Sequence, residues 1–249
     1  MKVSIMQPNL FMWGGLLKAM TDSDIHIVLD NVKASKNSRY NRNLVEGRLK
    51  KDWLTVPYIG FSRNSEIRYL EVNTSEKTVS KIRDDFFRRY VGATHFQEAC
   101  AVLERTFNGC EYGVESQLLV DIYASYVASL AKGPLRMPDV VMASELVSGM
   151  EEKQSPTGIH LVNLLLESVG ATTYLAAENT RKYASAEDYT VPEVRIQEFR
   201  AREYSQGFDG VECMQNTFSP NLSTLDTIAF MGMDSLQEYL DDCNRWLDG

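Results

Sequence analysis

Histidine and cysteine are scarce in this chain, and their spacing excludes the common metal sites. Among 249 residues there are three histidines and four cysteines, no two cysteines form a CxxC pair, and no HExxH run occurs. Zinc sites in proteins depend on such closely spaced ligands. We therefore expect no metal site and free, structural cysteines. Cys213 stands in a polar loop setting and is the candidate if a Cys–His nucleophile pair exists.

The sequence motifs of several large enzyme classes are also absent. There is no GxSxG, no Walker A run and no GxGxxG after a strand, which argues against an α/β-hydrolase, a P-loop enzyme and a dinucleotide-binding enzyme. Gly14-Gly15 lies at a strand-to-helix turn but lacks a third glycine, so a close helix–strand contact is favoured over a phosphate loop. Nucleotidylyl-transferring enzymes place histidines at that turn, and the absence of histidine there leaves adenylate chemistry as an alternative only.

Long apolar runs and an excess of positive charge are missing as well. No apolar run approaches the roughly 20 residues that span a bilayer, and the first residues do not form a signal-peptide pattern, so we expect a cytoplasmic protein without a membrane span. The net charge of −8 argues against nucleic acid as the main partner. An anionic small ligand stays compatible with this charge, because one arginine and a few backbone N–H groups can bind it.

The first thirty residues contain the clearest fold pattern. The apolar run Val3–Ile5 stops at the polar turn Gln7-Pro8-Asn9, a helix is predicted over 13–20, and a second apolar run ends at Asp30. This strand–loop–helix–strand order is typical of an α/β fold with a mostly parallel sheet. Ligands of such sheets bind outside the carboxyl ends of the strands, where Gln7, Asn9 and Asp30 are expected.

The remaining sequence extends this pattern around a helical middle region. Further strands are predicted at residues 53–59, 67–72, 139–142, 172–176 and 194–199. Helices are predicted at residues 75–90, 95–107, 115–130, 155–169 and 234–247, the last two opened by Ser155-Pro156 and by a capping box. Residues 32–48 are predicted to form a polar loop, and Glu178 follows a strand end. We expect a single domain over 1–249, with residues 75–133 as a candidate helical insert and a C-terminal helix.

Several motifs in this order resemble the WbqC-like protein family over nearly the full length. The matching residues are Gln7-Pro8-Asn9, Trp13, Gly15, Asn41-Arg42-Asn43, Trp53-Leu54-Thr55-Val56-Pro57, Tyr174-Leu175, Tyr183, Tyr204-Ser205-Gln206 and Phe218 through Asp226. Two positions depart from the family pattern: Met6 replaces its histidine before Gln-Pro, and Met12 replaces its proline before Trp13. His26 lies on the second strand, where a structural role is favoured.

The resemblance implies amide formation, such as attachment of an aminoacyl group to an amino sugar in O-antigen, other surface-polysaccharide or natural-product biosynthesis. Its partners would be a small-molecule amine and an acyl or aminoacyl carrier protein, and no cofactor is indicated. A non-catalytic binder of a sugar nucleotide or a carrier-bound intermediate, and an ATP-dependent amide ligase, stay open as alternatives.

The candidate site residues divide by chemistry. Asp30 or Asp226 would act as the base, provided that burial raises the pKa of the carboxyl. The predicted substrate-binding residues are polar groups and aromatic walls, namely Gln7, Asn9, Trp13, Asn41, Arg42, Asn43, Trp53, Glu178 and Tyr183. For Trp53 the competing interpretation is a place in the core, and for residues 41–43 it is a helix cap.

Overall fold

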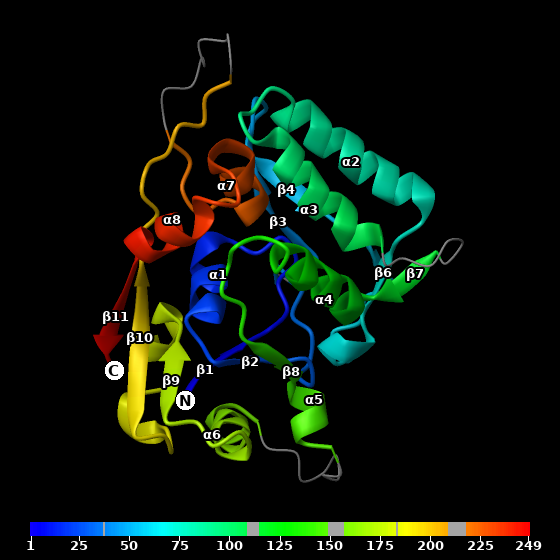
Figure 1. The fold of residues 1–249 in the computed structure, drawn as a ribbon. Helices are drawn as coiled ribbons and strands as arrows, with labels where there is room; N and C mark the ends of the chain where they lie inside the picture. Colours follow the sequence, from blue (N-terminus) through cyan, green and yellow to red (C-terminus); the bar gives the residue numbers. More distant parts are fainter. Residues whose placement is uncertain (37, 109–114, 149–156, 183, 209–217) are drawn as a thin grey trace.

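A six-stranded, mostly parallel sheet forms the frame of the protein. The computed structural model describes residues 1–36, 38–108, 115–148, 157–182, 184–208 and 218–249. The strands follow the order β11-β10-β9-β1-β2-β8 across the sheet (Figure 1). Their bounds are β1 Lys2–Met6, β2 Ile25–Val28, β8 Asp139–Met142, β9 Thr173–Ala176, β10 Glu193–Phe199 and β11 Asn244–Asp248. Within the described part of this sheet, β10 and β11 form the one antiparallel pair, and the other pairs are parallel. The predicted fold class is therefore confirmed.

Helices cover both faces of this sheet. Their bounds are α1 Gly14–Thr21, α2 Glu76–Tyr90, α3 Phe96–Asn108, α4 Leu119–Leu130, α5 Ala143–Leu146, α6 Ile159–Ser168, α7 Thr224–Met231 and α8 Leu236–Cys243. Val3 and Ile5 of β1 face a smaller apolar cluster that includes Leu165 of α6. The larger cluster joins α1, α7 and α8 with the helical middle region, where α2, α3 and α4 lie side by side (Figure 1). Parallel strands are buried on both faces, which explains why β1 and β2 are short and mostly apolar, with Ser4 and His26 as their buried polar residues.

The region between β2 and α2 differs from the sequence prediction. The expected polar loop contains β3 Arg42–Val45, which pairs with β4 Asp52–Thr55 in a separate antiparallel ribbon. A second small sheet holds β5 Tyr58–Ile59, β6 Glu71–Asn73 and β7 Ser116–Leu118, and residues 67–69 form a 3-10 turn. The strands predicted at 53–59 and 67–72 are thus broken and lie outside the main sheet. Pro57 lacks a backbone N–H, so a ladder running through it would lose a hydrogen bond.

The chain ends differently from the predicted helix over 234–247. The helix α8 is present, but it stops at Cys243, and residues 244–248 form the edge strand β11. The apolar stripe of this helix is buried through Cys243, whereas Leu247 is 38% exposed. Pairing with β10 provides hydrogen-bond partners for the backbone N–H and C=O groups of these last residues. The apolar spacing of residues 244–248 alone could not predict this pairing. Ser235 is the N-cap and makes no side-chain capping bond; the Ser155-Pro156 cap lies outside the described residues.

Replacing Gly47 by alanine should destabilise the protein more than the same change at Gly170. Both glycines have positive φ, 59° and 64°, so each alanine meets the same backbone penalty of about 1–2 kcal/mol. At Gly47, in the β3–β4 turn, a Cβ would also clash with the backbone carbonyl oxygen of Arg89, whereas nothing lies within 4 Å of a Cβ at Gly170. Overpacking costs about 1–3 kcal/mol more. Urea unfolding of both variants measures the difference, and equal losses would contradict this account.

Candidate functional site

The carboxyl edge of the parallel sheet carries exposed polar groups at its topological switch point. The chain leaves β1 toward β2 on one side, while β9 lies on the other side of β1. Gln7 follows β1 directly, and Glu178 opens a 3-10 helix, Glu178–Lys182, after β9; both side chains are exposed. An Nη of Arg200 lies 3.8 Å from a carboxylate oxygen of Glu178. These two predicted residues therefore lie where open α/β sheets usually bind ligands.

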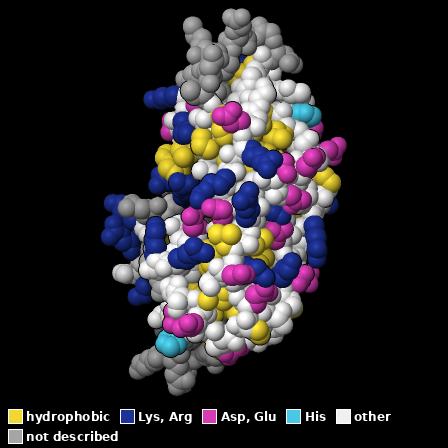
Figure 2. Space-filling view, turned by 90° about the vertical axis from the view of Figure 1, so that its left-hand side faces the viewer, with side chains coloured by type: hydrophobic (Ala, Val, Ile, Leu, Met, Phe, Trp, Pro, Cys, Tyr) yellow, Lys and Arg dark blue, Asp and Glu magenta, His cyan; other side chains and the backbone are white. Residues whose placement is uncertain are grey.

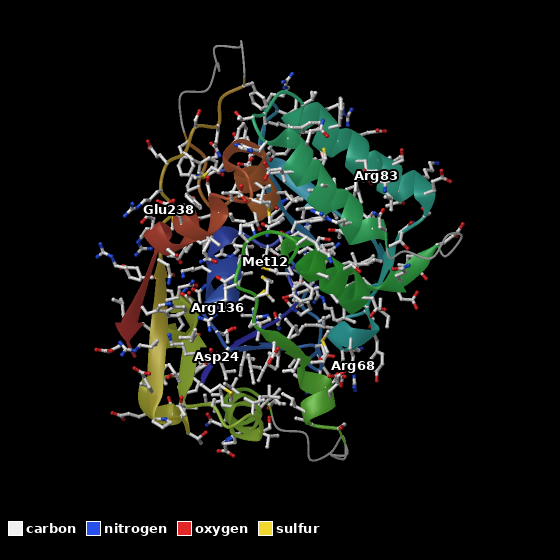
Figure 3. The ribbon with its side chains drawn as sticks, in the orientation of Figure 1. Met12, Asp24, Arg68, Arg83, Arg136 and Glu238 are labelled. Carbon is white, nitrogen blue, oxygen red and sulfur yellow. The ribbon has the colours of Figure 1, made fainter. Side chains whose placement is uncertain are left out.

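Three segments that are far apart in sequence meet at the start of α7. Met12 lies in the middle of the molecule beside α1, and its carbonyl accepts a hydrogen bond of 2.8 Å from the backbone N–H of Thr224 (Figure 3). The N–H of Ser223 donates to the carbonyl of Leu44 on β3 at 2.8 Å. In the same region the amide of Asn43 donates to the Asn9 side chain at 3.0 Å. Blocks predicted separately around residues 9–13, 43 and 223–226 are thus joined.

Trp13 belongs to the same junction. It forms an isolated β-bridge with Ser223, and its ring meets that of Phe199 edge to face, with centroids 5.2 Å apart. A Cβ at Gly15 would collide with this indole, so the glycine of the Gly14-Gly15 turn allows a close ring contact. The indole is partly exposed, which leaves part of the ring available as an apolar wall.

Asp226 is the most completely hydrogen-bonded acid of this junction. Its carboxylate is fully buried and accepts bonds from the hydroxyls of Tyr90 at 2.6 Å and Tyr204 at 2.8 Å, and from the amide of Gln206 at 3.1 Å. Burial raises the pKa of Asp226, the three donors oppose that rise, and the nearby Glu46 carboxylate reinforces it. Burial likewise raises the pKa values of both tyrosines. Tyr90 is buried and Tyr204 is partly exposed, so of these two tyrosines only Tyr204 has part of its side chain at the surface.

Two predicted site residues are instead bound to the protein itself. Asp30 is 2% exposed, and its two carboxylate oxygens accept bonds from the backbone N–H and the hydroxyl of Ser144 at 2.9 and 2.6 Å. The side-chain amide of Asn41 is buried and donates to the Val56 carbonyl at 2.7 Å. These contacts favour structural roles, in which Asp30 holds the start of α5 against β2 and Asn41 holds the chain beyond β4.

Arg42 and Trp53 lie together on the ribbon β3–β4. The guanidinium carbon of Arg42 is 4.6 Å from the centroid of the Trp53 ring, and that of Arg39 is 5.4 Å from the same centroid. Both contacts have the geometry of a cation–π interaction. The indole is partly exposed, so Trp53 is not a buried core residue, and its place in a substrate site stays a prediction. Tyr183 lies outside the described residues.

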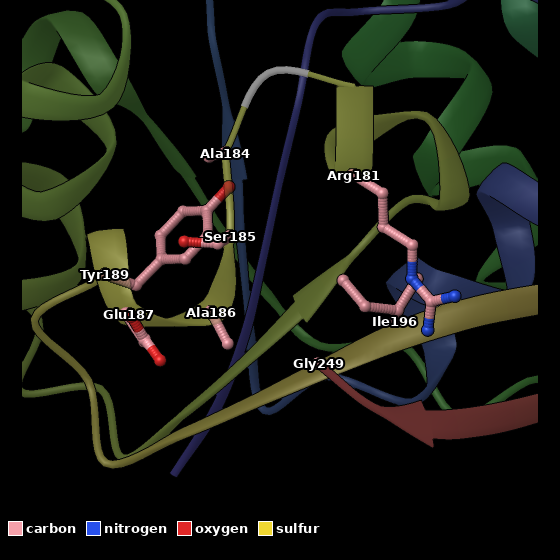
Figure 4. Close-up of a pocket in the computed structure, with 8 residues that line it drawn as sticks. All are labelled: Arg181, Ala184, Ser185, Ala186, Glu187, Tyr189, Ile196 and Gly249. Carbon is pink, nitrogen blue, oxygen red and sulfur yellow. The ribbon is translucent and has the colours of Figure 1, made fainter.

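A cavity of about 440 Å³ lies between the segment that follows β9 and the strand β10 (Figure 4). Arg181, Ser185 and Tyr189 line it, together with Ile196 of β10. Its volume falls within the range of small-molecule sites. Glu178 precedes this segment in the chain but does not line the cavity.

A buried hydrogen-bonded group around His26 was not part of the predicted site. His26 is 2% exposed, its Nδ1 lies 2.8 Å from the Ser4 hydroxyl, and its Nε2 lies 3.3 Å from the Tyr123 hydroxyl. Burial lowers the pKa of His26 to about 4. His26, Met6 and Gln7 line a common cavity of about 10 Å³. This volume holds about one water molecule. The structural role favoured from the sequence agrees with these contacts.

The donors around Asp226 were also missed by sequence reasoning. Tyr90 falls on the apolar stripe of α2 and has the pattern of a core residue. Tyr204 and Gln206, by contrast, belong to the block Tyr204-Ser205-Gln206 that matches the family. That match was the one signal in the sequence that could have identified them as site residues. Among the described residues, no three His, Cys, Asp or Glu side chains are grouped to hold a metal ion. In the same part of the chain no helix is long and apolar enough to cross a membrane.

Comparison with known proteins places these blocks in one family. The sequence model of the WbqC-like protein family matches residues 7–238, so the chain belongs to that family. It is also 22% identical to an uncharacterized protein of Mycobacterium tuberculosis (strain ATCC 25618 / H37Rv), Rv1507c, over 251 residues that cover 98% of this chain and 99% of that protein. No solved structure matches the chain at a significant level.

Proposed function

We propose that this protein transfers an activated acyl or aminoacyl group to the amine of an amino sugar or a similar acceptor, forming an amide. The observation that carries the proposal is Asp226, a buried carboxyl whose pKa is raised and which accepts a hydrogen bond from the hydroxyl of Tyr204, a partly exposed residue. A carboxyl with an ordinary pKa is a poor base for an amine, and burial changes that pKa in the useful direction.

The proton would travel in two concerted transfers. As the amine nitrogen bonds to the acyl carbon and the donor's leaving group departs, the nitrogen loses a proton to the Tyr204 oxygen. The Tyr204 proton passes at the same time along its 2.8 Å hydrogen bond to Asp226. Gln7 and Glu178, exposed at the switch point, would orient polar groups of the acceptor, and Trp13 would supply an apolar wall. The family resemblance supports a role in surface-polysaccharide or natural-product biosynthesis, with a carrier protein as one source of the acyl group.

The sharpest test compares Tyr204→Phe with Tyr90→Phe. Each variant keeps its ring and removes one donor to Asp226, but only Tyr204 reaches the surface. We expect amide formation from an aminoacyl thioester and an amino-sugar nucleotide to fall at least about 100-fold in kcat for Tyr204→Phe, the usual scale of lost general acid–base catalysis. Tyr90→Phe should stay within about tenfold of the wild type. Equal losses in the two variants, or no turnover by the wild type, would contradict the proposed route.

A second candidate function is a non-catalytic binder of a sugar nucleotide or a carrier-bound intermediate. Two observations favour it, because each removes a candidate catalytic group. The carboxylate of Asp30, the other predicted base, is bound by Ser144, and Met6 stands where the family has a histidine. This function predicts binding without product. A thermal-shift screen with amino-sugar nucleotides and phosphopantetheine compounds tests it, because a ligand at about 100 times its Kd stabilises the folded protein by about 2.7 kcal/mol.

A further inference from the structure

Positive charge is concentrated in one short segment of an otherwise acidic chain. Residues 33–51, the basic segment, contain seven lysines and arginines and one acidic residue, a net charge of +6. The chain as a whole carries −8, so all other residues together carry −14. The basic residues are Lys33, Lys36, Arg39, Arg42, Arg48, Lys50 and Lys51. Lys and Arg side chains gather along the left-hand edge of the face in Figure 2.

Arg39 and Arg42 differ from the other cations of this segment because they share one aromatic ring. Their guanidinium carbons lie 5.4 and 4.6 Å from the Trp53 centroid, so the two are at most about 10 Å apart. Stacking on a ring uses the flat face of a guanidinium and leaves its N–H edges available for an anion. Within the described part of the chain, neither forms an ion pair with a carboxylate. Arg48, in contrast, already donates to the Val91 carbonyl.

A groove runs beside the same indole. It has a volume of about 300 Å³ and is lined by Trp53, Thr55 and Pro57 from the β4 side and by Thr78, Lys81 and Asp85 from α2. The carboxylate of Asp85 is already paired with Arg89, at 2.8 Å. Lys81 lines the groove with an exposed side chain. The groove shares Trp53 with the arginine pair, so its apolar and polar lining lies beside the two guanidiniums.

We propose that Arg39 and Arg42, stacked on Trp53, bind the diphosphate group of a nucleotide-linked substrate, with the adjacent groove holding the attached organic group. Two guanidiniums and a lysine match a ligand with two or more negative charges, whereas one arginine fork satisfies a single carboxylate. The charge of −14 on the rest of the chain disfavours an extended polyanion such as nucleic acid. The nucleotide part of this inference rests on the proposed function; the diphosphate site itself does not.

Isothermal titration calorimetry with inorganic pyrophosphate, UDP and 4′-phosphopantetheine tests the site. We expect pyrophosphate and UDP to bind, UDP more tightly, with both affinities falling at high salt. Arg39→Gln, Arg42→Gln and Trp53→Ala should each weaken pyrophosphate binding at least about tenfold, which corresponds to about 1.4 kcal/mol. Circular dichroism verifies that each variant is folded.

Two control variants separate a built site from diffuse attraction. Lys36→Gln removes a charge of the basic segment outside the arginine pair, and Arg245→Gln removes an exposed arginine on β11. Both should bind pyrophosphate like the wild type. The site is refuted if pyrophosphate does not bind at millimolar concentration, or if either control weakens binding as much as Arg42→Gln. Tighter binding of phosphopantetheine than of UDP would refute the nucleotide-linked ligand.

The outcome is independent of turnover. Tyr204→Phe should bind pyrophosphate like the wild type, because its hydroxyl contacts Asp226 and not the arginine pair. Anion binding without amide formation would contradict the proposed function alone. Amide formation by a protein that does not bind pyrophosphate would contradict the diphosphate site alone.

Discussion

Acidification from pH 7 to pH 4 is expected to lower the free energy of unfolding by about 3 kcal/mol through His26 alone. Burial lowers the pKa of this histidine to about 4 in the folded protein, against 6.5 for a free side chain. Between these two pKa values the unfolded chain binds a proton that the folded protein does not. Stability therefore falls as the pH falls through this window, and the loss is complete only below the folded pKa.

Urea unfolding at several pH values between 7 and 4 measures this effect. In His26→Gln the side chain can still hydrogen-bond but cannot be protonated, so most of the slope assigned to His26 should disappear. His160→Gln, which removes an exposed histidine of α6, should leave the slope unchanged. If His26→Gln proves too unstable to measure, the ring can be followed by NMR in the wild type. Titration of the His26 ring near pH 6.5 would show that this histidine is not held neutral by burial.

The parallel frame could be predicted because its signals are local. The apolar runs of β1 and β2, the turn at Pro8 and the helix between them lie within thirty residues. The end of α6 could also be predicted from the sequence, because Gly170 is a glycine just after the helix and adopts the positive φ that ends many helices. Each of these features depends on neighbours in sequence, which hydrophobic spacing and backbone preferences describe directly.

The misassigned segments depend on partners that are distant in sequence. Residues 41–43 have the polarity of a loop, but Asn43 is buried because Asn9, 34 positions away, accepts its amide hydrogen bond. Residues 244–248 continue a helical spacing, yet the free edge of β10 offers them a ladder about fifty residues upstream. A pattern within a window of 18 residues contains neither partner.

The candidate site shows the same division. Asp226 could be singled out from its motif, but Tyr90 lies 136 positions away and has the spacing of a core residue. Asp30 was placed correctly beyond β2, whereas its partner Ser144 lies in α5, just after the neighbouring strand β8 and 114 positions later in the chain. Side-chain type therefore suggested both acids, and only the fold distinguishes the one bound by tyrosines from the one that anchors a helix.

Asp226→Ala should be the most destabilising single change in the candidate site. It removes the acceptor of the buried Tyr90 hydroxyl and one acceptor of the Tyr204 hydroxyl and of the Gln206 amide, which belong to partly exposed residues. An unsatisfied buried group costs about 1–3 kcal/mol and the two other donors add to that, so we expect a loss of about 3 kcal/mol in urea unfolding. Asp234→Ala, at an exposed position before α8, is the control and should change little. A loss below about 1 kcal/mol in Asp226→Ala would mean that water replaces the carboxylate and that the site is open.

Asp226→Asn separates the charge of this carboxyl from its hydrogen bonds. Because burial raises the pKa of Asp226, the folded protein binds a proton more readily than the unfolded chain above about pH 4. Stability contributed by this group therefore falls as the pH rises, opposite in sign to the effect of His26. The stability advantage of the wild type over Asp226→Asn should shrink between pH 4 and pH 7, and the His26 contribution cancels in this comparison. An advantage that grows with pH would show that the three donors outweigh burial, that Asp226 is a permanently ionised structural acid, and that the base must be sought elsewhere.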